Sequence, residues 1–329
     1  MSTATKEASD ILQRLLPQHR DLLAAYDPDR AIALLDSVRP EQAYNDIPDA
    51  LAELWREVTA RFGEGGFAAF QALTMLRLME RFDSRASGRR YTDAIRECFA
   101  KSFRRILLAI EDAAYPAYRK TTDLLLKDLA ICRQQMFPAG VRLVEPLSLV
   151  EGTLAVCGGP LQALRFLALM AETGGRSPFY RVHVHLSELD DFTPDGWIRC
   201  CVRLADMLEI NPEIRGVVGG SWFYDPAVSR VSPHLAYLRV WPEQNGARTF
   251  FRRVEPDGGG AFATSQTRRN QFASGRYVPK AYALVWSRRA LIACAKRVRE
   301  AERSSPNPSS LVRPGTPERD APASRQPAD

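Results

Sequence analysis

The chain has 329 residues, enough for two ordinary domains, and its 45% hydrophobic and 26% charged residues exclude wholesale disorder. No apolar run approaches the ~20 residues that span a membrane, and the amino terminus lacks the apolar core of a secretory signal, so we expect a cytoplasmic protein without a membrane partner. The net charge of +6 leaves an acidic or a phosphate-bearing partner open, and the six scattered cysteines are expected to be reduced.

Residues 1–138 are predicted to form a helical domain. From about Ser9 to Phe137 apolar side chains recur at helical spacing, most clearly in Tyr91–Ile110, where they fall on one stripe. Glycines begin at Gly63 and interrupt an otherwise helical run, so one helix is expected to end there and another to begin at Phe67. We expect five or six helices, and nothing in this part of the sequence indicates chemistry.

Residues 139–303 are predicted to form an α/β layer, which makes the whole chain α+β or α/β. Six β-rich runs are expected to be strands: 141–145, 153–157, 180–186, 216–222, 235–240 and 282–286. Four runs are expected to be helices: 160–172, 194–210, 263–273 and 287–303. From Ser304 to Asp329 the chain is rich in Pro, Ser and Arg, and we predict a disordered tail.

Two motifs follow each other between Val182 and Leu238. The first is Phe192-Thr193-Pro194 after a run containing His183 and His185, and the second is Ser221-Trp222-Phe223-Tyr224-Asp225-Pro226. This order resembles the GNAT-like carboxyl-terminal domain of a bacterial acyltransferase-like family, which is preceded by a helical domain. In that family a His-bearing strand leads to a helix begun by Leu-Thr-Pro, and then to a strand closing in Ser-Trp, two apolar residues and Asp-Pro.

The resemblance implies a mixed sheet flanked by helices and the transfer of an acyl group from acyl-CoA to an unidentified small-molecule acceptor. It equally admits a descendant that binds without turnover. In an active enzyme His183 or His185 would be the base and Asp225 would orient the substrate. The cofactor's carbonyl or pyrophosphate would be received by the backbone at Gly219, Gly220 and Ser221.

The two histidines alternate on an expected strand, so both side chains face the same side. His183 and His185 are half of the four histidines in the chain. With Glu188, Asp190 or Asp191 beyond the strand end, they can form a general base or half of a metal site. No second pair of ligands completes such a site, so we predict no metal. Histidines hydrogen-bonded on a half-exposed strand explain the same pattern.

A glycine pair, Gly158-Gly159, precedes Pro160 at the start of an expected helix. Glycine lets backbone N–H groups approach an anion, which the helix amino terminus also favours, so this turn can hold a phosphate. A tight turn with proline at the first helical position explains the same residues, and the fuller phosphate-binding fingerprints are missing.

Basic residues are concentrated between Arg230 and Glu300, where 14 Lys or Arg stand against 4 Asp or Glu. Arg268, Arg269 and Arg276 belong to a short helix and its end, and guanidinium forks suit phosphate. We expect them to cluster with Arg252, Arg253 and Lys280. An adenine nucleotide of the cofactor and a nucleic acid both fit this block. Surface charge with salt bridges to the more acidic helical domain fits it equally well.

Three functional classes therefore stay open: a GNAT-like acyltransferase, a non-catalytic protein that docks nucleic acid or an acidic partner through residues 230–300, and an interaction protein built on the helical domain. The cysteines at positions 200, 201 and 294 are expected to be small buried residues. No nucleophile elbow, zinc-protease motif or P-loop occurs in the sequence.

Overall fold

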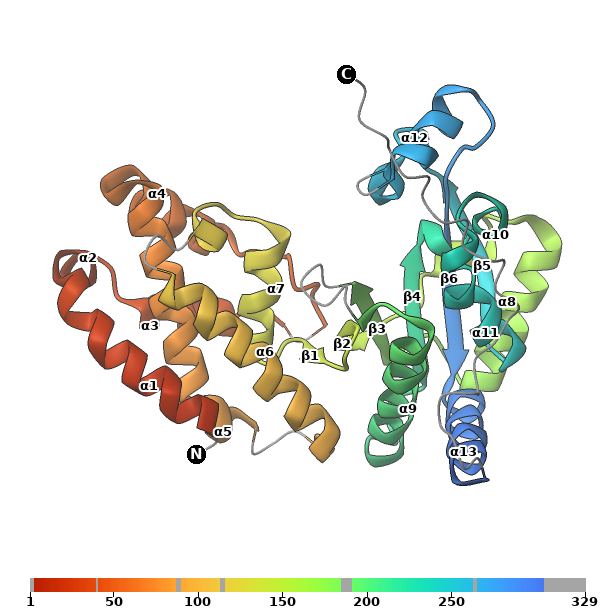
Figure 1. Ribbon diagram of the computed structural model, residues 1–329, viewed down its shortest axis with the longest axis horizontal. Coiled ribbons are helices and arrows are strands. Elements are labelled where there is room, and N and C mark those ends of the chain that lie inside the picture. The colour runs from red at the N-terminus through yellow and green to blue at the C-terminus, as the bar shows by residue number, and fades with distance from the viewer. Residues whose placement is uncertain are drawn as a thin grey trace, which may run out of the picture.

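The computed structural model describes residues 3–39, 41–86, 90–112, 116–184, 191–262 and 265–304. Its amino-terminal third is helical, as the apolar periodicity predicts, and lies on the left in Figure 1. The helices are α1 (Thr3–Leu15), α2 (Arg20–Ala25), α3 (Pro28–Asp36), α4 (Asp49–Glu80), α5 (Phe82–Ala86), α6 (Asp93–Glu111) and α7 (Asp123–Cys132), with 3₁₀ turns η1 (Leu16–His19) and η2 (Pro116–Tyr118). The expected glycine break is a kink: Gly63 has a φ of 69°, and the helical segments on either side of it form one element.

A six-stranded mixed sheet follows, with the order β1-β2-β3-β4-β6-β5. The strands are β1 (Phe137–Pro138), β2 (Arg142–Ser148), β3 (Phe179–Val184), β4 (Gly216–Ser221), β5 (Arg248–Val254) and β6 (Lys280–Ser287). β3 and β4 are parallel and are joined through a helix, whereas the other described pairs are antiparallel. A helical layer followed by a mixed sheet confirms the predicted fold class.

Helices cover both faces of this sheet (Figure 1). The helices of this part of the chain are α8 (Gly159–Thr173), α9 (Pro194–Ile210), α10 (Val228–Val231), α11 (Tyr237–Gln244), α12 (Gln266–Ala273) and α13 (Arg288–Ser304), with 3₁₀ turns η3 (Gly152–Ala155), η5 (Trp222–Tyr224), η6 (Pro233–Leu235) and η7 (Gly259–Phe262). Of these, α12 lies beyond the end of the sheet in Figure 1. Strand alternation divides the apolar side chains of β4 between the faces. Val217 packs with α9 and α13, and Val218 packs with α8.

Two predicted strands are wrong. Residues 153–157 form η3 and a turn, and Val156 in that run is 77% exposed, so its apolar character marks no buried strand. Residues 235–240 belong to η6 and α11, where Leu238 is buried and Trp241 packs edge-to-face on Trp286. The strand β5 was not predicted, because its arginines mask the β-favouring Thr-Phe-Phe run; charged side chains are common on edge strands such as this one.

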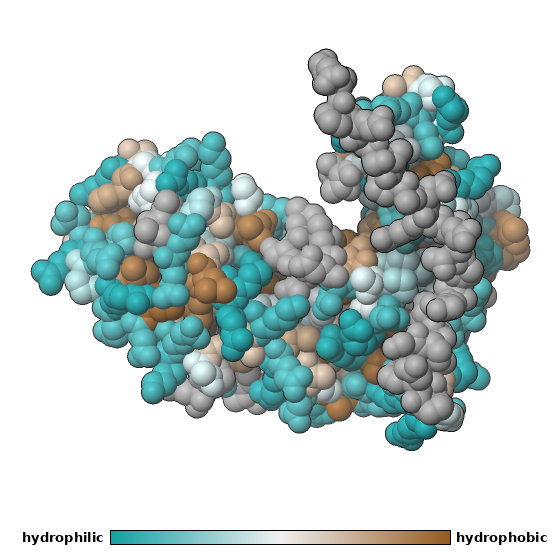
Figure 2. All heavy atoms as spheres, viewed as in Figure 1, coloured by the Kyte–Doolittle hydropathy of each residue, from teal (hydrophilic) through white to brown (hydrophobic). Residues whose placement is uncertain are grey.

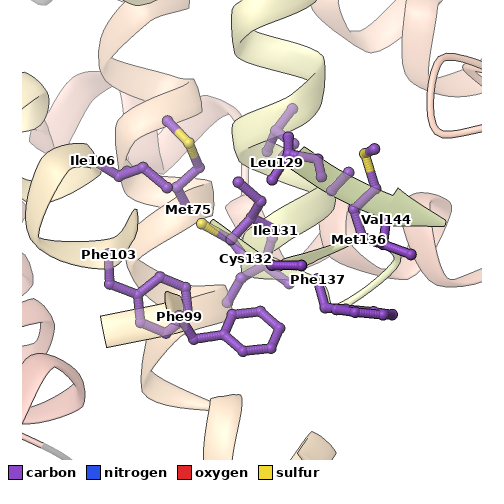
Figure 3. Close-up of a cluster of buried hydrophobic side chains, with 14 of the residues drawn as sticks. Met75, Phe99, Phe103, Ile106, Leu129, Ile131, Cys132, Met136, Phe137 and Val144 are labelled. Carbon is purple, nitrogen blue, oxygen red and sulfur yellow. The ribbon is translucent and has the colours of Figure 1, made fainter. Parts of the chain in front are cut away.

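One apolar interior runs from the helical region into the α9 face of the sheet. Figure 3 shows the junction, where side chains from α4, α6, α7, β1 and β2 meet. Among them Phe99 and Phe103 of α6 and Met136 beside β1 are each at most 1% exposed. A second and smaller cluster lies between α8 and the opposite face. The predicted boundary at residue 138 therefore coincides with β1, inside a shared core.

The outer face of α8 is apolar and exposed. Leu161, Leu164 and Leu167 are between 60% and 71% exposed, while Phe166 and Leu169 on the inner face are buried. Figure 2 shows brown atoms at the right-hand edge, where Figure 1 places α8, on a surface that is otherwise mostly hydrophilic in this view.

Candidate functional site

The parallel strands β3 and β4 separate at their carboxyl ends. Their paired residues run from Tyr180 with Val217 to Val182 with Gly219, although β3 continues to Val184 and β4 to Ser221. In Figure 1 the carboxyl end of β4 points toward the notch that Figure 2 shows between the helical region and the α12 end of the molecule. Open sheets bind ligands in the crevice outside the carboxyl ends of parallel strands, so this separation is the candidate site.

Thr193 and Pro194 begin α9 beside this point. The Thr193 hydroxyl accepts a hydrogen bond from the backbone N–H of Gly196 at 3.1 Å, and Pro194 takes the first helical position, where no N–H is needed. A side chain at Gly196 would overlap the backbone oxygen of Asp191, so glycine is required for the close approach. The Thr-Pro motif therefore directs the amino terminus of α9 to the end of the sheet.

His183 lies on the α8 face of β3 and is held by Glu145 of β2. Its Nε2 is 2.9 Å from Oε2 of Glu145, and the two side chains are 22% and 9% exposed. Burial raises the pKa of Glu145, but the hydrogen bonds from His183 and from the backbone N–H of Tyr44 outweigh it and hold that pKa below its ordinary value. An ionised Glu145 accepts the Nε2 proton of His183, which leaves Nδ1 as the basic atom.

The same histidine contacts the helical region. The Tyr44 ring stands edge-on to the His183 ring, with centroids 5.2 Å apart, and the Tyr44 hydroxyl donates to Asp123 of α7. Lys127 is 7% exposed and donates to Asp123 at 2.6 Å and to the backbone oxygen of Val184 at 2.8 Å. This network ties the end of β3 to α7 and gives the lysine charge a carboxylate partner.

A row of charged contacts continues across the α8 face toward Gly220. Arg181 lies 3.9 Å from Glu145 and 3.7 Å from Glu151, and Arg252 of β5 makes a two-oxygen contact with Glu151. A Cβ on Gly220 would lie 2.6 Å from Nη1 of Arg252, so the absence of a side chain lets this guanidinium rest on the strand. The structure thus brings His183 and Gly220 to the same face.

The α9 face of the same strand ends carries Arg142, the first residue of β2. Arg142 is 1% exposed, and its Cζ lies 5.0 Å from the Phe192 ring, 4.8 Å from Trp197 and 5.0 Å from Phe223. Gly219 faces this side, where a Cβ would lie 2.8 Å from both the Tyr224 hydroxyl and Val182. Gly219 and Gly220 therefore look onto different faces of the sheet.

Asp225 and Arg268 belong to a separate cluster beyond the end of β4. Asp225 is 3% exposed and accepts the backbone N–H of Ala227 at 3.0 Å, which closes the turn after η5. Burial raises its pKa, and this outweighs the opposing effect of Lys280. The Arg268 guanidinium lies 4.4 Å from the Trp222 ring and donates to Ser232 at 2.9 Å. Both groups stabilise turns, and their described contacts do not reach His183.

The other predicted cofactor contacts are distributed differently. The Ser221 hydroxyl accepts the backbone N–H of Phe223 and caps η5. Arg269 is exposed and bonds to Gln266 and Phe262 of its own segment, and exposed Arg276 bonds to Ser274. The predicted arginine cluster is therefore dispersed: Arg268 is buried, whereas Arg269 and Arg276 face solvent.

His185, Glu188 and Asp190 lie outside the described residues, as does the predicted tail apart from Ser304.

Ion pairs within the chain engage part of the basic block. Arg239, Arg248, Arg252, Arg253 and Arg299 each contact a carboxylate. The partners outside the block are Glu151, Glu172 and Asp206, which belong to the α/β region and not to the helical region as the sequence interpretation proposed.

Two hollows lie away from the strand separation. A cavity of about 590 Å³ lies between the helical region and the sheet, and none of the predicted site residues lines it. Its lining includes Tyr91, Arg133, Tyr180, Met207 and Asn211. A groove of about 560 Å³ joins the Gly158 turn to Pro226, Lys280 and Tyr282. The Gly158-Gly159 turn has the predicted proline in the first turn of α8, and Gln162 folds back over Gly158.

Sequence reasoning missed Glu145 and Arg142, although both lie in a predicted strand. Glu145 is 38 residues from His183, and no local pattern reports a contact at that separation. A charge at the first position of an apolar strand was the available signal for Arg142. Cys200, Cys201 and Cys294 are buried, as predicted, and burial raises the pKa of each thiol, to about 12 for Cys200 and about 11 for Cys294.

Across the described ranges, no group of three or more His, Cys, Asp and Glu side chains is arranged to hold a metal ion. None of the described helices has the length and apolar composition needed to cross a bilayer. The chain matches no protein-family model, no curated protein and no solved structure.

Proposed function

We propose that the chain is a GNAT-like acyltransferase of the cytoplasm that binds acyl-CoA where β3 and β4 separate. The observation that carries the proposal is the parting of these parallel strands beyond Val182 and Gly219, with His183 and Gly220 on one face. The order in the chain, a His-bearing strand, a helix begun by Thr193-Pro194 and a strand closing in Ser221-Trp222, agrees with the resemblance. All six cysteines are unpaired, in keeping with a reducing compartment.

In this proposal His183 is the general base. Glu145 holds its Nε2 proton, so Nδ1 takes a proton from the attacking amine of the acceptor. The amine nitrogen forms a bond to the thioester carbon, the carbon–sulfur bond breaks, and the thiolate leaves and is then protonated. The backbone beyond Gly219, no longer paired with β3, would receive the carbonyl oxygen.

The residues at the strand ends fit an anionic cofactor on one count. Arg252 lies against Gly220, where a Cβ would stand 2.6 Å from its Nη1, and in this proposal its guanidinium, which also pairs with Glu151, would contact the cofactor. In this proposal Arg269 and Arg276, which face solvent, would contact the nucleotide part of the cofactor, whereas Asp225, buried in its turn, would not reach an acceptor beside His183.

The test measures binding and transfer separately. Calorimetric titration with acetyl-CoA and longer acyl-CoAs, followed by transfer assays with a panel of amines, is carried out on wild type, Gly220→Val and His183→Gln. We expect Gly220→Val to lose binding, and His183→Gln to bind but to transfer roughly 10²–10⁴-fold more slowly. His234→Gln, an exposed histidine on η6, is the matched control and is expected to behave as wild type.

Absence of saturable acyl-CoA binding in wild type would refute the proposal. If the same protein then bound DNA or RNA with an affinity that fell steeply with salt, the basic block at 230–300 would be the functional surface. Equal binding by wild type and Gly220→Val would place any CoA site elsewhere, and the 560 Å³ groove beside Lys280 would be the next to test.

A further inference from the structure

A buried arginine at the end of the sheet has an unpartnered hydrogen-bonding edge in the described part of the chain. Arg142 is 1% exposed, and neither its Nε nor its Nη2 has a partner among the described residues. These two N–H groups lie on one edge of the planar guanidinium and point in the same direction. That edge matches the two oxygens of a carboxylate in a pair of parallel, charge-assisted hydrogen bonds.

The surroundings of Arg142 supply no counter-charge in the part of the chain that the structure describes. Three aromatic rings enclose it, and attraction to their faces offsets part of the cost of burying the charge. Its charge acts on the pKa of four neighbouring groups, the thiols of Cys200 and Cys201 and the phenols of Tyr224 and Tyr237. Burial raises the pKa of each, to about 12 for Tyr237, so all four are neutral at pH 7.

The acid nearest in sequence to the enclosing rings is paired elsewhere. Asp191 lies 3.7 Å from Lys101 and 3.6 Å from Arg199. An uncompensated buried charge is among the most costly features of a protein interior. An anion that occupied this edge would remove most of that cost, because it would supply both the missing charge and the missing acceptors.

Arg142 lies at the carboxyl ends of the parallel strands, beside the start of a helix. Arg142 pairs across β2 and β3 with Val184, the last residue of β3. Trp197 lies in the first turn of α9, a helix of 17 residues whose amino terminus favours negative charge, and Phe223 follows the end of β4. The unpartnered guanidinium and the helix terminus are independent features, and both indicate an anion at the point where the parallel strands part.

We propose that Arg142 binds the carboxylate of a small molecule that enters between the carboxyl ends of β3 and β4. A singly charged planar group is favoured over phosphate, because one guanidinium balances one charge and no second cation lies over the three rings in the described chain. The rings then cover the apolar part of the ligand. This inference does not rest on acyl transfer, since it requires only the buried edge and its position.

The experiment compares acetate with acetamide, which has the same shape without the charge, at equal ionic strength set with sodium chloride. Each is titrated to tens of millimolar while the midpoint of thermal unfolding is followed; inorganic phosphate is a further arm. We expect acetate to raise the wild-type midpoint saturably, with a millimolar dissociation constant, and acetamide and chloride to leave it unchanged. Phosphate is expected to give a smaller shift than acetate.

Three variants assign the effect to the guanidinium edge. Arg142→Met fills a similar volume without a charge to bury, so it is expected to fold and to lose the acetate response. Arg142→Lys keeps the charge but has no two-point edge, and we expect its acetate affinity to fall at least tenfold. Arg199 lies on α9, and its side chain is 53% exposed. Arg199→Met is therefore the matched control and should respond to acetate as wild type does.

Three results would overturn the inference: no acetate-dependent shift in wild type, the same shift in Arg142→Met as in wild type, or a phosphate shift as large as that of acetate. The first would mean that the edge is closed to ligands. The other two would place the anion elsewhere or make it a phosphate. None of these results bears on acyl-CoA binding, which is measured separately.

Discussion

Replacing Glu145 by glutamine removes a charge from the centre of the candidate site while keeping its shape. Glu145 accepts the backbone N–H of Tyr44 at 2.7 Å and contacts Nε2 of His183 at 2.9 Å, and its side chain is 9% exposed. A hydrogen bond to a charged group is worth roughly 1.5–3 kcal/mol and one between neutral groups roughly 0.5–1.5 kcal/mol, so each bond loses about 1 kcal/mol. We expect Glu145→Gln to reduce the free energy of unfolding by about 2 kcal/mol.

Urea unfolding at pH 7, followed by tryptophan fluorescence, measures this loss. The midpoint should fall without a change in the slope, because the surface exposed on unfolding stays the same. Glu53→Gln is the matched control: Glu53 is 54% exposed and pairs with Arg56 on one helix, an arrangement worth about 0.5 kcal/mol or less. In the cycle of Glu145→Gln and His183→Gln, the coupling energy should be about 1 kcal/mol.

The pH dependence provides a second readout. The pKa of Glu145 is lower in the folded protein than its ordinary value of 4.5, so its ionised form stabilises the fold above that value. This contribution is lost as the pH falls through the lowered pKa, and the difference between wild type and Glu145→Gln should shrink in acid. A loss in Glu145→Gln equal to that in Glu53→Gln, or a difference that does not change with pH, would refute the assignment.

Three further predictions concern the scaffold. Gly196→Ala should lower the free energy of unfolding by about 1–3 kcal/mol, because the new Cβ would overlap the backbone of Asp191. Gly65→Ala, where α4 has open space, should raise the free energy of unfolding by roughly 0.5–1 kcal/mol. Thermal unfolding of both variants shows whether the two changes have opposite signs. The Tyr118 hydroxyl donates to the fully buried Asp128 at 3.0 Å. In urea unfolding, Tyr118→Phe should lower the free energy of unfolding by about 1 kcal/mol and Asp128→Ala by about 3–5 kcal/mol. Equal losses in the two variants would contradict this pairing. Cys157 is exposed and the other five cysteines are buried, so a thiol reagent should modify one cysteine rapidly in the native protein and all six in denaturant; two fast thiols would contradict the fold.

Local sequence patterns were sufficient to predict those helices whose start and apolar periodicity are visible in the sequence itself. Helix α9 was predictable because a capping threonine and a proline precede an amphipathic run, and the structure places its first residue at Pro194. The amphipathic stripe over 91–110 became α6 for the same reason. Residues 235–240 misled because aromatic and β-branched residues favour strands, while packing of Trp241 against Trp286 stabilises a helix there.

The candidate site depended on contacts that no local pattern reports. His183 was identified from its type and position, but its partner Glu145 comes from another strand, and Tyr44 comes from a loop 101 residues before Glu145. The basic block was read as a surface, whereas Arg268 is 3% exposed and hydrogen-bonded inside. A count of charged residues describes composition, whereas the fold determines which charges are buried or paired and which are exposed to solvent.

The shared interior of the helices and the sheet makes the two halves of the chain depend on each other. A gene fragment that stopped near Pro138 would encode helices whose apolar side chains at the junction were open to water, and one that started there would encode a sheet without this covering. The sheet would therefore keep its covered core in another protein only if these helices went with it. A substitution at the junction therefore changes the packing of both parts at once.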